Sequence, residues 1–174
     1  DGRTEEAAAY AKELNEKTEF QPMLGQCRNP ITDAFLYSRS KELEAQGVDV
    51  NMNVNVPRIP KVSNIYMVSA LGNLLDNALK YTPSQGMVTA RLQREGEAVV
   101  LVVEDSGPGI DEQMVHQALL PFHRLDNVGN VPGAGIGLAL VNDIARLHRT
   151  HPQLTRSETL GGLRVRVRFL SVTV

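Results

Sequence analysis

The stretch MVTARLQREGEAVVLVVED, residues 87–105, carries the clearest strand signal in the sequence. It contains two apolar runs of high β-propensity, separated only by Gly96-Glu97, and this pattern predicts a β-hairpin. On its N-terminal side, VDVNMNVNV (residues 48–56) alternates strictly between apolar and polar side chains, which predicts a half-buried strand. Near the end of the chain, LTRSETL and GGLRVRVRFLSV predict a second hairpin. Strands that follow one another in such pairs indicate a mostly antiparallel sheet.

Three further segments, residues 30–46, 63–81 and 135–148, have apolar residues at helical spacing. In the first of them, the inward face is expected to consist of Ile31, Ala34, Phe35, Tyr37 and Leu43. A shorter helix is expected over residues 111–119, and residues 120–134 hold Gly and Pro without periodicity. Since long loops without structure tend to be functional, we expect residues 120–134 to form a lid.

Together, these elements predict an α+β fold, a two-layer α/β sandwich. Its sheet is expected to be mixed, mostly antiparallel and built from about five strands, with three helices covering one face. A length of 174 residues fits one domain. We expect residues 20–174 to form that domain, and residues 1–19 to be the end of a preceding helix or flanking sequence.

Composition excludes several classes of protein. The formal net charge of −2 argues against a nucleic-acid partner, which usually requires a basic surface. Cys27 is the only cysteine, which excludes an internal disulfide framework and a cysteine-rich zinc site. The longest apolar runs, such as residues 98–103, are far shorter than the roughly 18 residues of a membrane span. We therefore expect no nucleic acid and no membrane contact for this segment.

The first chemically informative stretch is LGNLLDNALKYTP, residues 71–83. Asn73 and Asn77 are four residues apart, so their amides lie one turn apart on one face of the predicted helix. Asparagine is a poor residue inside a helix, and two of them beside leucines indicate a need for amide oxygens. Taken alone, however, asparagines on a solvent-exposed helix face are the commoner explanation.

The second stretch is VEDSGPGI, residues 103–110, in which an apolar strand runs directly into Asp105. Gly107 and Gly109 allow a tight turn and the close approach of a ligand. A carboxylate at the end of a rigid strand can accept a hydrogen bond from an exocyclic amine. Alone, the stretch is equally typical of an ordinary strand-to-helix turn.

The third stretch is VPGAGIGLALV, residues 131–141, where Gly133, Gly135 and Gly137 precede an apolar helix. Backbone N–H groups at a glycine-rich helix start form an anion site. No Gly-Lys-Ser/Thr follows, so it is not a P-loop, and its spacing is not that of a Rossmann fingerprint. By itself, this stretch could be a flexible hinge.

In this order, the three stretches resemble the N, G1 and G2 boxes of the ATP-binding domain that histidine kinases share with GyrB-type topoisomerases, Hsp90 and MutL. LPFHRLDN, residues 120–127, resembles the F box of histidine kinases, and SETLGG resembles their closing hairpin. The resemblance extends over about residues 20–169. It implies the Bergerat form of the α/β sandwich, with an ATP lid.

For the phosphate end, the resemblance implies that Asn77 coordinates Mg²⁺ through its amide oxygen, while Asn73 lies near the phosphates. Lys80 would contact a phosphate, Tyr81 would line the pocket, and Arg124 would reach toward the γ-phosphate. Because Mg²⁺ keeps several waters and takes other ligands from phosphates, one protein oxygen can suffice.

For the base end, the resemblance implies that Asp105 accepts a hydrogen bond from adenine N6 and that Ile110 packs on the base. Gly107 and Gly109 would shape the base pocket. The resemblance also implies that backbone N–H groups of Gly133, Gly135 and Gly137 hold the triphosphate. Leu138 would start the helix behind them.

One position distinguishes branches of the family. The ATPases of this group have a glutamate that activates water where this chain has Asn73, and an amide cannot act as a general base. The resemblance therefore implies transfer of the γ-phosphate to a histidine, which requires mainly positioning and charge neutralisation. That histidine is expected on a separate dimerisation domain, because the histidines of this chain read as structural or surface residues: His116, His123, His148 and His151.

The expected partners are therefore ATP, the phosphoacceptor domain of the same kinase and a downstream response regulator. We expect a cytoplasmic domain, monomeric as this fragment, of a homodimeric membrane receptor. Three alternatives stay open: an anti-sigma-factor-type serine kinase, which PFHRLD argues against, a degenerate interaction module, and a non-enzymatic nucleotide sensor.

Overall fold

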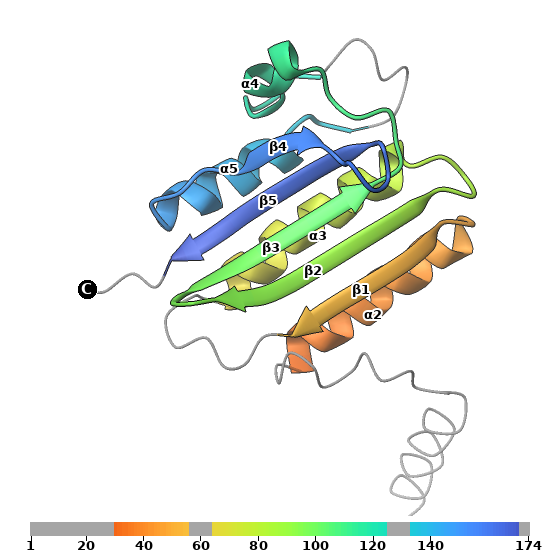
Figure 1. Cartoon of the computed structure of the whole chain (residues 1–174), viewed down its shortest axis with the longest axis horizontal. Helices are drawn as coiled ribbons and strands as arrows, with labels where there is room; N and C mark the ends of the chain where they lie inside the picture. Colours follow the sequence, from red (N-terminus) through yellow and green to blue (C-terminus); the bar gives the residue numbers. More distant parts are fainter. Residues whose placement is uncertain (1–29, 56–63, 125–132, 171–174) are drawn as a thin grey trace, which may run out of the picture.

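The computed structural model describes residues 30–55, 64–124 and 133–170. A five-stranded sheet forms one layer, in the order β1-β2-β3-β5-β4 (Figure 1). Its strands are β1 (Asp49–Asn55), β2 (Met87–Glu95), β3 (Ala98–Asp105), β4 (Gln153–Arg156) and β5 (Leu163–Leu170). The expectation for residues 1–19 lies outside the described residues.

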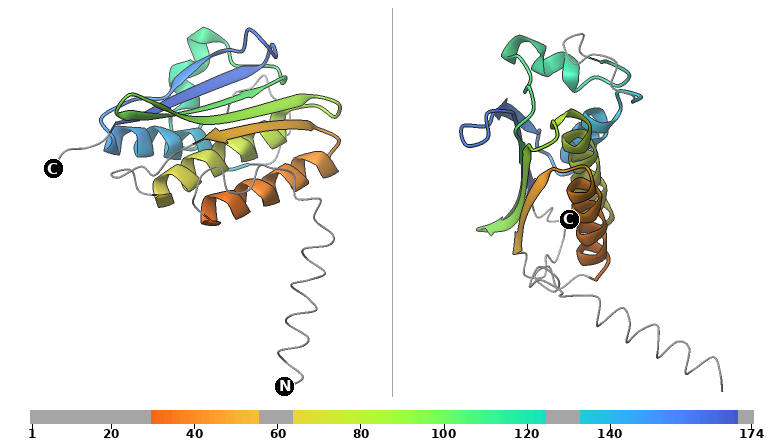
Figure 2. Two further views of the ribbon diagram at one scale, coloured as in Figure 1. Left: turned by 60° about the horizontal axis from the view of Figure 1, so that its bottom comes forward. Right: turned by 90° about the vertical axis from the view of Figure 1, so that its right-hand side faces the viewer.

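Three helices form the second layer: α2 (Pro30–Ala45), α3 (Asn64–Tyr81) and α5 (Gly137–Leu147). Figure 2 shows all three on the same face of the sheet. A single 3₁₀ turn, η1 (Glu112–Met114), and the short α4 (Val115–Ala118) lie beyond the end of the sheet (Figure 1). The predicted α+β two-layer sandwich is therefore confirmed.

The sheet is mixed because its connections differ in length. β1 pairs with β2 in parallel, and helix α3 makes the crossover that a parallel pair requires. The pairs β2–β3, β3–β5 and β4–β5 are antiparallel. Gly96 turns the β2–β3 hairpin at a φ of 62°, in the left-handed region where glycine carries no steric penalty. The predicted hairpin and closing hairpin are both present.

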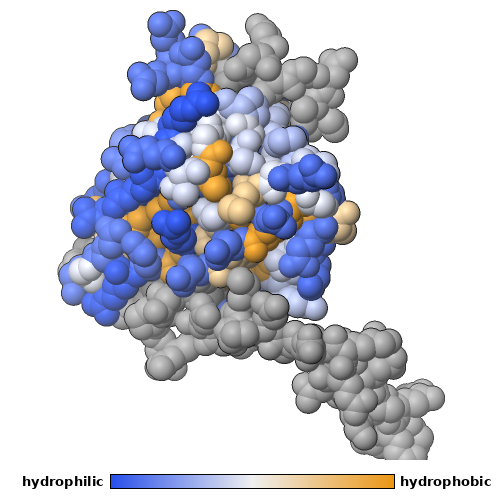
Figure 3. All heavy atoms as spheres, turned by 45° about the vertical axis from the view of Figure 1, so that its right-hand side comes forward, coloured by the Kyte–Doolittle hydropathy of each residue, from blue (hydrophilic) through white to orange (hydrophobic). Residues whose placement is uncertain are grey.

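Strand β3 is buried along its whole length, although helices cover only one face of the sheet. Leu101 and Val103 belong to the core beneath the helices, whereas Val102 faces the other side. There Val102 lies in register between Arg91 of β2 and Arg166 of β5, whose long aliphatic stems can cover it. Figure 3 shows a side of the molecule that is mainly hydrophilic, with small separate hydrophobic patches.

The inward face of α2 differs from the one predicted. Leu36 and Leu43 are buried, while Ala34 and Tyr37 are exposed. Leu36 and Leu43 are seven residues apart, which is two helical turns, so they share one face of the helix. The prediction gave this face the neighbours of Leu36 instead of Leu36 itself. Phe35 still packs toward α3, because a β-carbon at Gly72 would lie 2.9 Å from its Cζ. The side chain of Ile31 lies outside the described residues.

Two element boundaries also differ. The helix predicted over residues 111–119 divides into η1 and α4, and Asp111 caps its start by accepting a hydrogen bond from the Gln113 N–H. Helix α5 begins at Gly137 rather than at residue 135, because Gly135 has a φ of 69°, which a helix excludes. The glycine-rich segment thus delivers the chain to α5 instead of forming its first turn.

Candidate functional site

The C-terminal end of α3, the end of β3 and the start of α5 meet at one end of the molecule. They border an open cavity of about 690 Å³ and, beside it, a smaller one of about 460 Å³, both counted with the open solvent at their mouths. Of the predicted site residues, nine line the larger cavity: Asn77, Tyr81, Asp105, Gly109, Ile110, Arg124, Gly135, Gly137 and Leu138. The smaller cavity adds Asn73, Lys80 and Gly133. The two adjoining cavities together gather twelve of the thirteen predicted site residues.

Asp105 supplies the carboxylate of the larger cavity. The side chain is buried, and its Oδ1 accepts hydrogen bonds from the N–H groups of Gly107 at 2.9 Å and Leu163 at 3.1 Å. Burial raises the pKa of Asp105 above its ordinary value, and these two N–H groups offset part of that rise. Within the described part of the chain, no hydrogen bond reaches Oδ2, so this oxygen can accept one from a ligand in the cavity.

Gly107 is the one predicted residue that lines neither cavity. A β-carbon there would lie 2.6 Å from the backbone oxygen of Tyr81. Glycine at this position therefore lets the end of α3 approach the turn after β3, and its N–H holds the Asp105 carboxylate. Its contribution is to bring two walls of the cavity together.

The two asparagines face the first residue of α5. The Nδ2 of Asn73 donates to the backbone oxygen of Ser69, at 2.8 Å, which turns its Oδ1 toward α5. A β-carbon at Gly137 would lie 3.5 Å from that oxygen and 3.2 Å from the Oδ1 of Asn77. The amide oxygens that were predicted to share a helix face therefore both lie at the junction of α3 and α5.

The start of α5 provides backbone donors at the same place. Its N-cap residue, Ile136, makes no side-chain cap hydrogen bond. The first N–H groups of a helix have no partner within it, and the helix dipole is positive there. An anion between this end and the asparagines would therefore meet N–H donors on one side and amide groups on the other.

Two cationic side chains complete the smaller cavity. Lys80 lies at the end of α3, and a β-carbon at Gly133 would be 3.5 Å from its Nζ. Arg124 lines both cavities. The Phe122 N–H donates to the Gly135 oxygen at 3.0 Å, which joins the start of the predicted lid to the residue that follows the lid. The lid itself, apart from residues 120–124, 133 and 134, lies outside the described residues.

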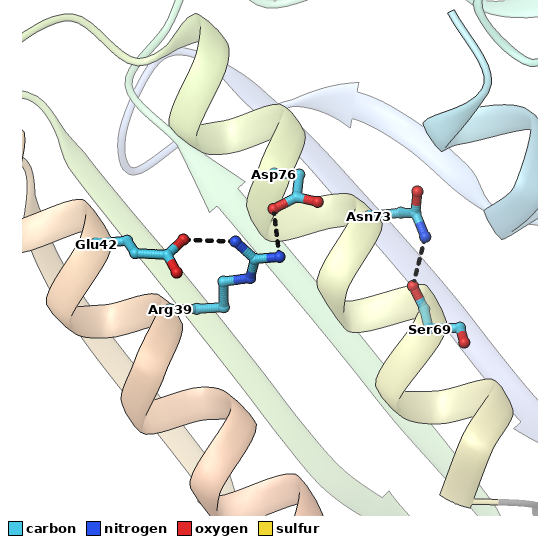
Figure 4. Close-up of polar contacts among 5 residues, drawn as sticks. All are labelled: Arg39, Glu42, Ser69, Asn73 and Asp76. Atoms are coloured by element: carbon cyan, nitrogen blue, oxygen red, sulfur yellow. Dashed lines mark hydrogen bonds and ion pairs between the residues drawn. The ribbon is translucent and has the colours of Figure 1, made fainter. Parts of the chain in front are cut away.

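A carboxylate that was not predicted, Asp76, also lines the smaller cavity. Figure 4 shows it turned toward α2, where Arg39 lies between Asp76 and Glu42, while Asn73 points to the other side of α3. The Nη2 of Arg39 is 3.2 Å from the Asp76 Oδ1. The ion pair neutralises a negative charge that would otherwise face an anionic ligand.

Other cavity residues also escaped prediction. His123 and Leu163 line the larger cavity, although the first was expected to be structural or on the surface. His123 is exposed and precedes Arg124, so its position in the F-box-like stretch was the available signal. His116 and His151 are exposed as expected. His148 is buried, edge-on to the rings of Tyr66 and Phe169, which fits its expected structural part.

Two negative findings bound the site. Within residues 30–55, 64–124 and 133–170, no group of three or more His, Cys, Asp or Glu side chains could hold a metal ion. Among the helices described, none combines the length and apolar character that crossing a membrane requires.

Comparison with known proteins agrees with this geometry. Among curated proteins, the chain is 30% identical over 129 residues to the phosphate regulon sensor protein PhoR of Pseudomonas aeruginosa. The aligned part is 71% of this chain and 29% of PhoR. Sensor histidine kinase GtrS of the same organism is 45% identical over 101 residues, 57% of this chain and 20% of GtrS. The chain therefore spans less than a third of the length of either relative.

Among solved structures, the mycobacterial sensor histidine kinase MprB superposes with a TM-score of 0.70 at 24% identity. The match covers 83% of this chain and 95% of the MprB chain, which shows the shared fold. The sequence profile of the family described as histidine kinase-, DNA gyrase B-, and HSP90-like ATPase matches residues 64–173, well over half of the chain. The chain belongs to this ATPase family.

Proposed function

We propose that this domain binds Mg-ATP in the two adjoining cavities and donates the γ-phosphate to a histidine on a separate dimerisation domain of a sensor kinase. The observation that carries the proposal is the Asp105 carboxylate. One of its oxygens is held by two backbone N–H groups, the other is left to a ligand, and its cavity continues to the asparagines and the start of α5.

At the base end, the Oδ2 of Asp105 accepts the hydrogen bond of the adenine amino group. Ile110 and Leu138 supply apolar walls, and both are packed against the hydrophobic core, which keeps them in place. A carboxylate cannot donate a hydrogen bond, so a base with an oxygen in place of the amine would meet repulsion. The arrangement therefore selects adenine over guanine by its charge pattern.

At the phosphate end, the donor set fits a magnesium–triphosphate group. Mg²⁺ prefers oxygen ligands and retains water, so the amide oxygen of Asn77 is a suitable single protein ligand, with Asn73 beside it. When bound, the ion neutralises phosphate charge during transfer. The N–H groups at the start of α5 hold phosphate oxygens, and Lys80 and Arg124 add positive charge.

Transfer to histidine is favoured over hydrolysis by the state of the polar side chains near the phosphates. Asn73 has an amide committed to Ser69, and the Asp76 carboxylate is paired with Arg39. Neither group is arranged to take a proton from water. The site therefore positions and neutralises the γ-phosphate but leaves the nucleophile to a second domain.

The proposal extends to the full-length protein. We propose that the full-length protein is a homodimeric membrane receptor whose cytoplasmic part includes this domain, and that a response regulator receives the phosphate. As an isolated fragment the domain is monomeric. The names of PhoR and GtrS, a sensor protein and a sensor histidine kinase, support the part of this proposal that assigns the domain to a sensor kinase.

Calorimetric titration with a non-hydrolysable ATP analogue, with and without Mg²⁺, tests the binding step. Wild type should bind saturably, Asn77→Ala should lose the Mg²⁺ dependence, and Asp105→Ala should lose the preference for adenine. Adding radiolabelled ATP and the phosphoacceptor domain of the same kinase then tests transfer. Binding without any labelled histidine would leave a nucleotide sensor, and no binding at millimolar nucleotide would leave an interaction module.

A further inference from the structure

Glu104, the residue before Asp105, is buried on the face of the sheet that carries no helix. Because successive side chains of a strand point to opposite faces, Glu104 and Asp105 lie on opposite sides of β3. The Oε1 of Glu104 accepts a hydrogen bond from the Ser157 hydroxyl at 2.9 Å, and both side chains are buried. These residues are 53 positions apart in the sequence, so the bond fixes the β4–β5 turn to β3.

Ser157 also organises that turn, residues 157–162. Its Oγ accepts from the Leu160 N–H at 3.0 Å, and its N–H donates to the Gly162 oxygen at 2.8 Å. The Gly161 N–H donates to the Ser157 oxygen at 2.9 Å. All polar groups of Ser157 are thus engaged, either within the turn or with Glu104.

The far end of the same turn holds the carboxylate of Asp105. The Gly162 N–H donates to the Asp105 backbone oxygen, and the Leu163 N–H donates to its Oδ1, both at 3.1 Å. The packing is tight, because a β-carbon at Gly162 would lie 2.3 Å from that Oδ1. The turn is therefore attached to β3 from both faces, through Glu104 on one and Asp105 on the other.

We propose that the Glu104–Ser157 hydrogen bond is a positioning device for Asp105 and that it determines the preference for adenine. With Ser157 anchored, Leu163 keeps Oδ1 occupied and directs Oδ2 into the cavity. Without the anchor, the turn relaxes, the carboxylate rotates or hydrates, and a ligand amine no longer meets a fixed acceptor. This inference rests on the proposed function and adds the residues behind its base selectivity.

Arg91 and Arg164 surround Glu104 without replacing Ser157. Their nitrogens lie 3.9 Å and 3.8 Å from its carboxylate oxygens, beyond hydrogen-bond distance. They neutralise the buried charge, whereas the serine hydroxyl sets the geometry. Glu104→Gln, which keeps an oxygen for Ser157, should therefore retain the selectivity of wild type.

The test compares a non-hydrolysable ATP analogue with its purine riboside counterpart, which lacks only the exocyclic amine. Wild type should prefer the amine by about tenfold, the effect of one hydrogen bond to a charged group. In Ser157→Ala the ratio should fall below about threefold while affinity for the analogue without the amine stays unchanged. Ser157→Thr, which keeps the hydroxyl, should restore the ratio, and Thr159→Ala, an exposed change in the same turn, should not alter it.

A structural effect alone would weaken both ligands equally, and this result in Ser157→Ala would overturn the proposal. An unchanged ratio would overturn it as well. If Ser157→Ala does not fold, Ser157→Cys, which keeps the size but is a weak donor, gives the same comparison. If wild type binds neither ligand, the proposed function itself is wrong. If wild type and Ser157→Ala both prefer the ligand with the amine to the same degree, only this inference is wrong.

Discussion

Gly137→Ala should separate stability from nucleotide binding. Gly137 is the first residue of α5 and has no positive φ, so its backbone accepts alanine without strain. The new β-carbon would lie 3.2 Å from the Oδ1 and 3.3 Å from the Nδ2 of Asn77. These distances are shorter than ordinary contacts, so the Asn77 amide must move by a few tenths of an ångström.

The two effects have opposite signs. Alanine is the better helix residue by about 0.5–1 kcal/mol, which would leave the melting temperature unchanged or raise it by up to about 4 °C. A displaced Asn77 loses a contact with a charged ligand, and such contacts contribute about 1.5–3 kcal/mol. Affinity for Mg-ATP should therefore fall by about 10- to 100-fold.

Thermal unfolding and calorimetric titration of the same sample measure both effects. Leu140→Ala is the control on the same helix, because Leu140 is exposed and lines neither cavity. That variant should bind Mg-ATP within about threefold of wild type. If Gly137→Ala binds as tightly as wild type, or loses affinity only in proportion to a lowered melting temperature, the assignment of Asn77 to the phosphate end is wrong.

Three further changes test other parts of the structure. Burial raises the pKa of Asp105, so the folded state holds its proton more tightly than the unfolded state, and stability falls as pH rises from about 3.8 through the raised pKa. Asp105→Asn should therefore raise the free energy of unfolding, measured in urea, more at pH 7 than at pH 4. A larger increase at pH 4 would contradict this sign. Arg39→Gln should weaken ATP binding in titrations because it leaves the Asp76 charge without its partner, and the loss should be larger at low salt. The free energy of unfolding should change by less than about 1 kcal/mol. Adding Asp76→Asn to the Arg39→Gln variant should reverse the loss of binding. Leu43→Ala should lower the free energy of unfolding by about 3 kcal/mol in denaturant titration, and a negligible change would show that α2 is not part of the folded unit.

The sequence predicted most of the fold and most of the residues that line the two cavities, because both depend on short-range patterns. Alternation in β1 and the Gly96 turn are local signals that specify strands and a hairpin. The asparagines of α3 and the glycines before α5 are likewise local, and the order of the motifs placed them in one family. What each of these residues contributes to binding stays a prediction until the titrations are made.

Long-range neighbours could not be predicted in this way. Nothing near Asp105 in the sequence indicates that Leu163 donates to its carboxylate, because the contact depends on how β5 pairs with β3. The same is true of Arg39, which comes from α2 to pair with Asp76. The wrong prediction for the inward face of α2 has a related cause. Phe35 is partly buried and its neighbour Leu36 is fully inward, so the apolar pattern alone did not show which of the two positions faces the core.

The two ends of the site are held by different parts of the fold. Asp105 is held by the sheet, through the β4–β5 turn and the hydrogen bonds on both faces of β3. Asn77 faces the start of α5, which follows the glycine-rich segment, and the Phe122–Gly135 hydrogen bond joins the start of the predicted lid to the residue that follows it. Changes in the turn should therefore alter which base is chosen, whereas changes around α5 should alter affinity for phosphate and Mg²⁺ without changing that choice. Under the proposed function, base selectivity should therefore depend on the sheet layer that holds Asp105, and affinity for the phosphates should depend on the helix layer that holds Asn77.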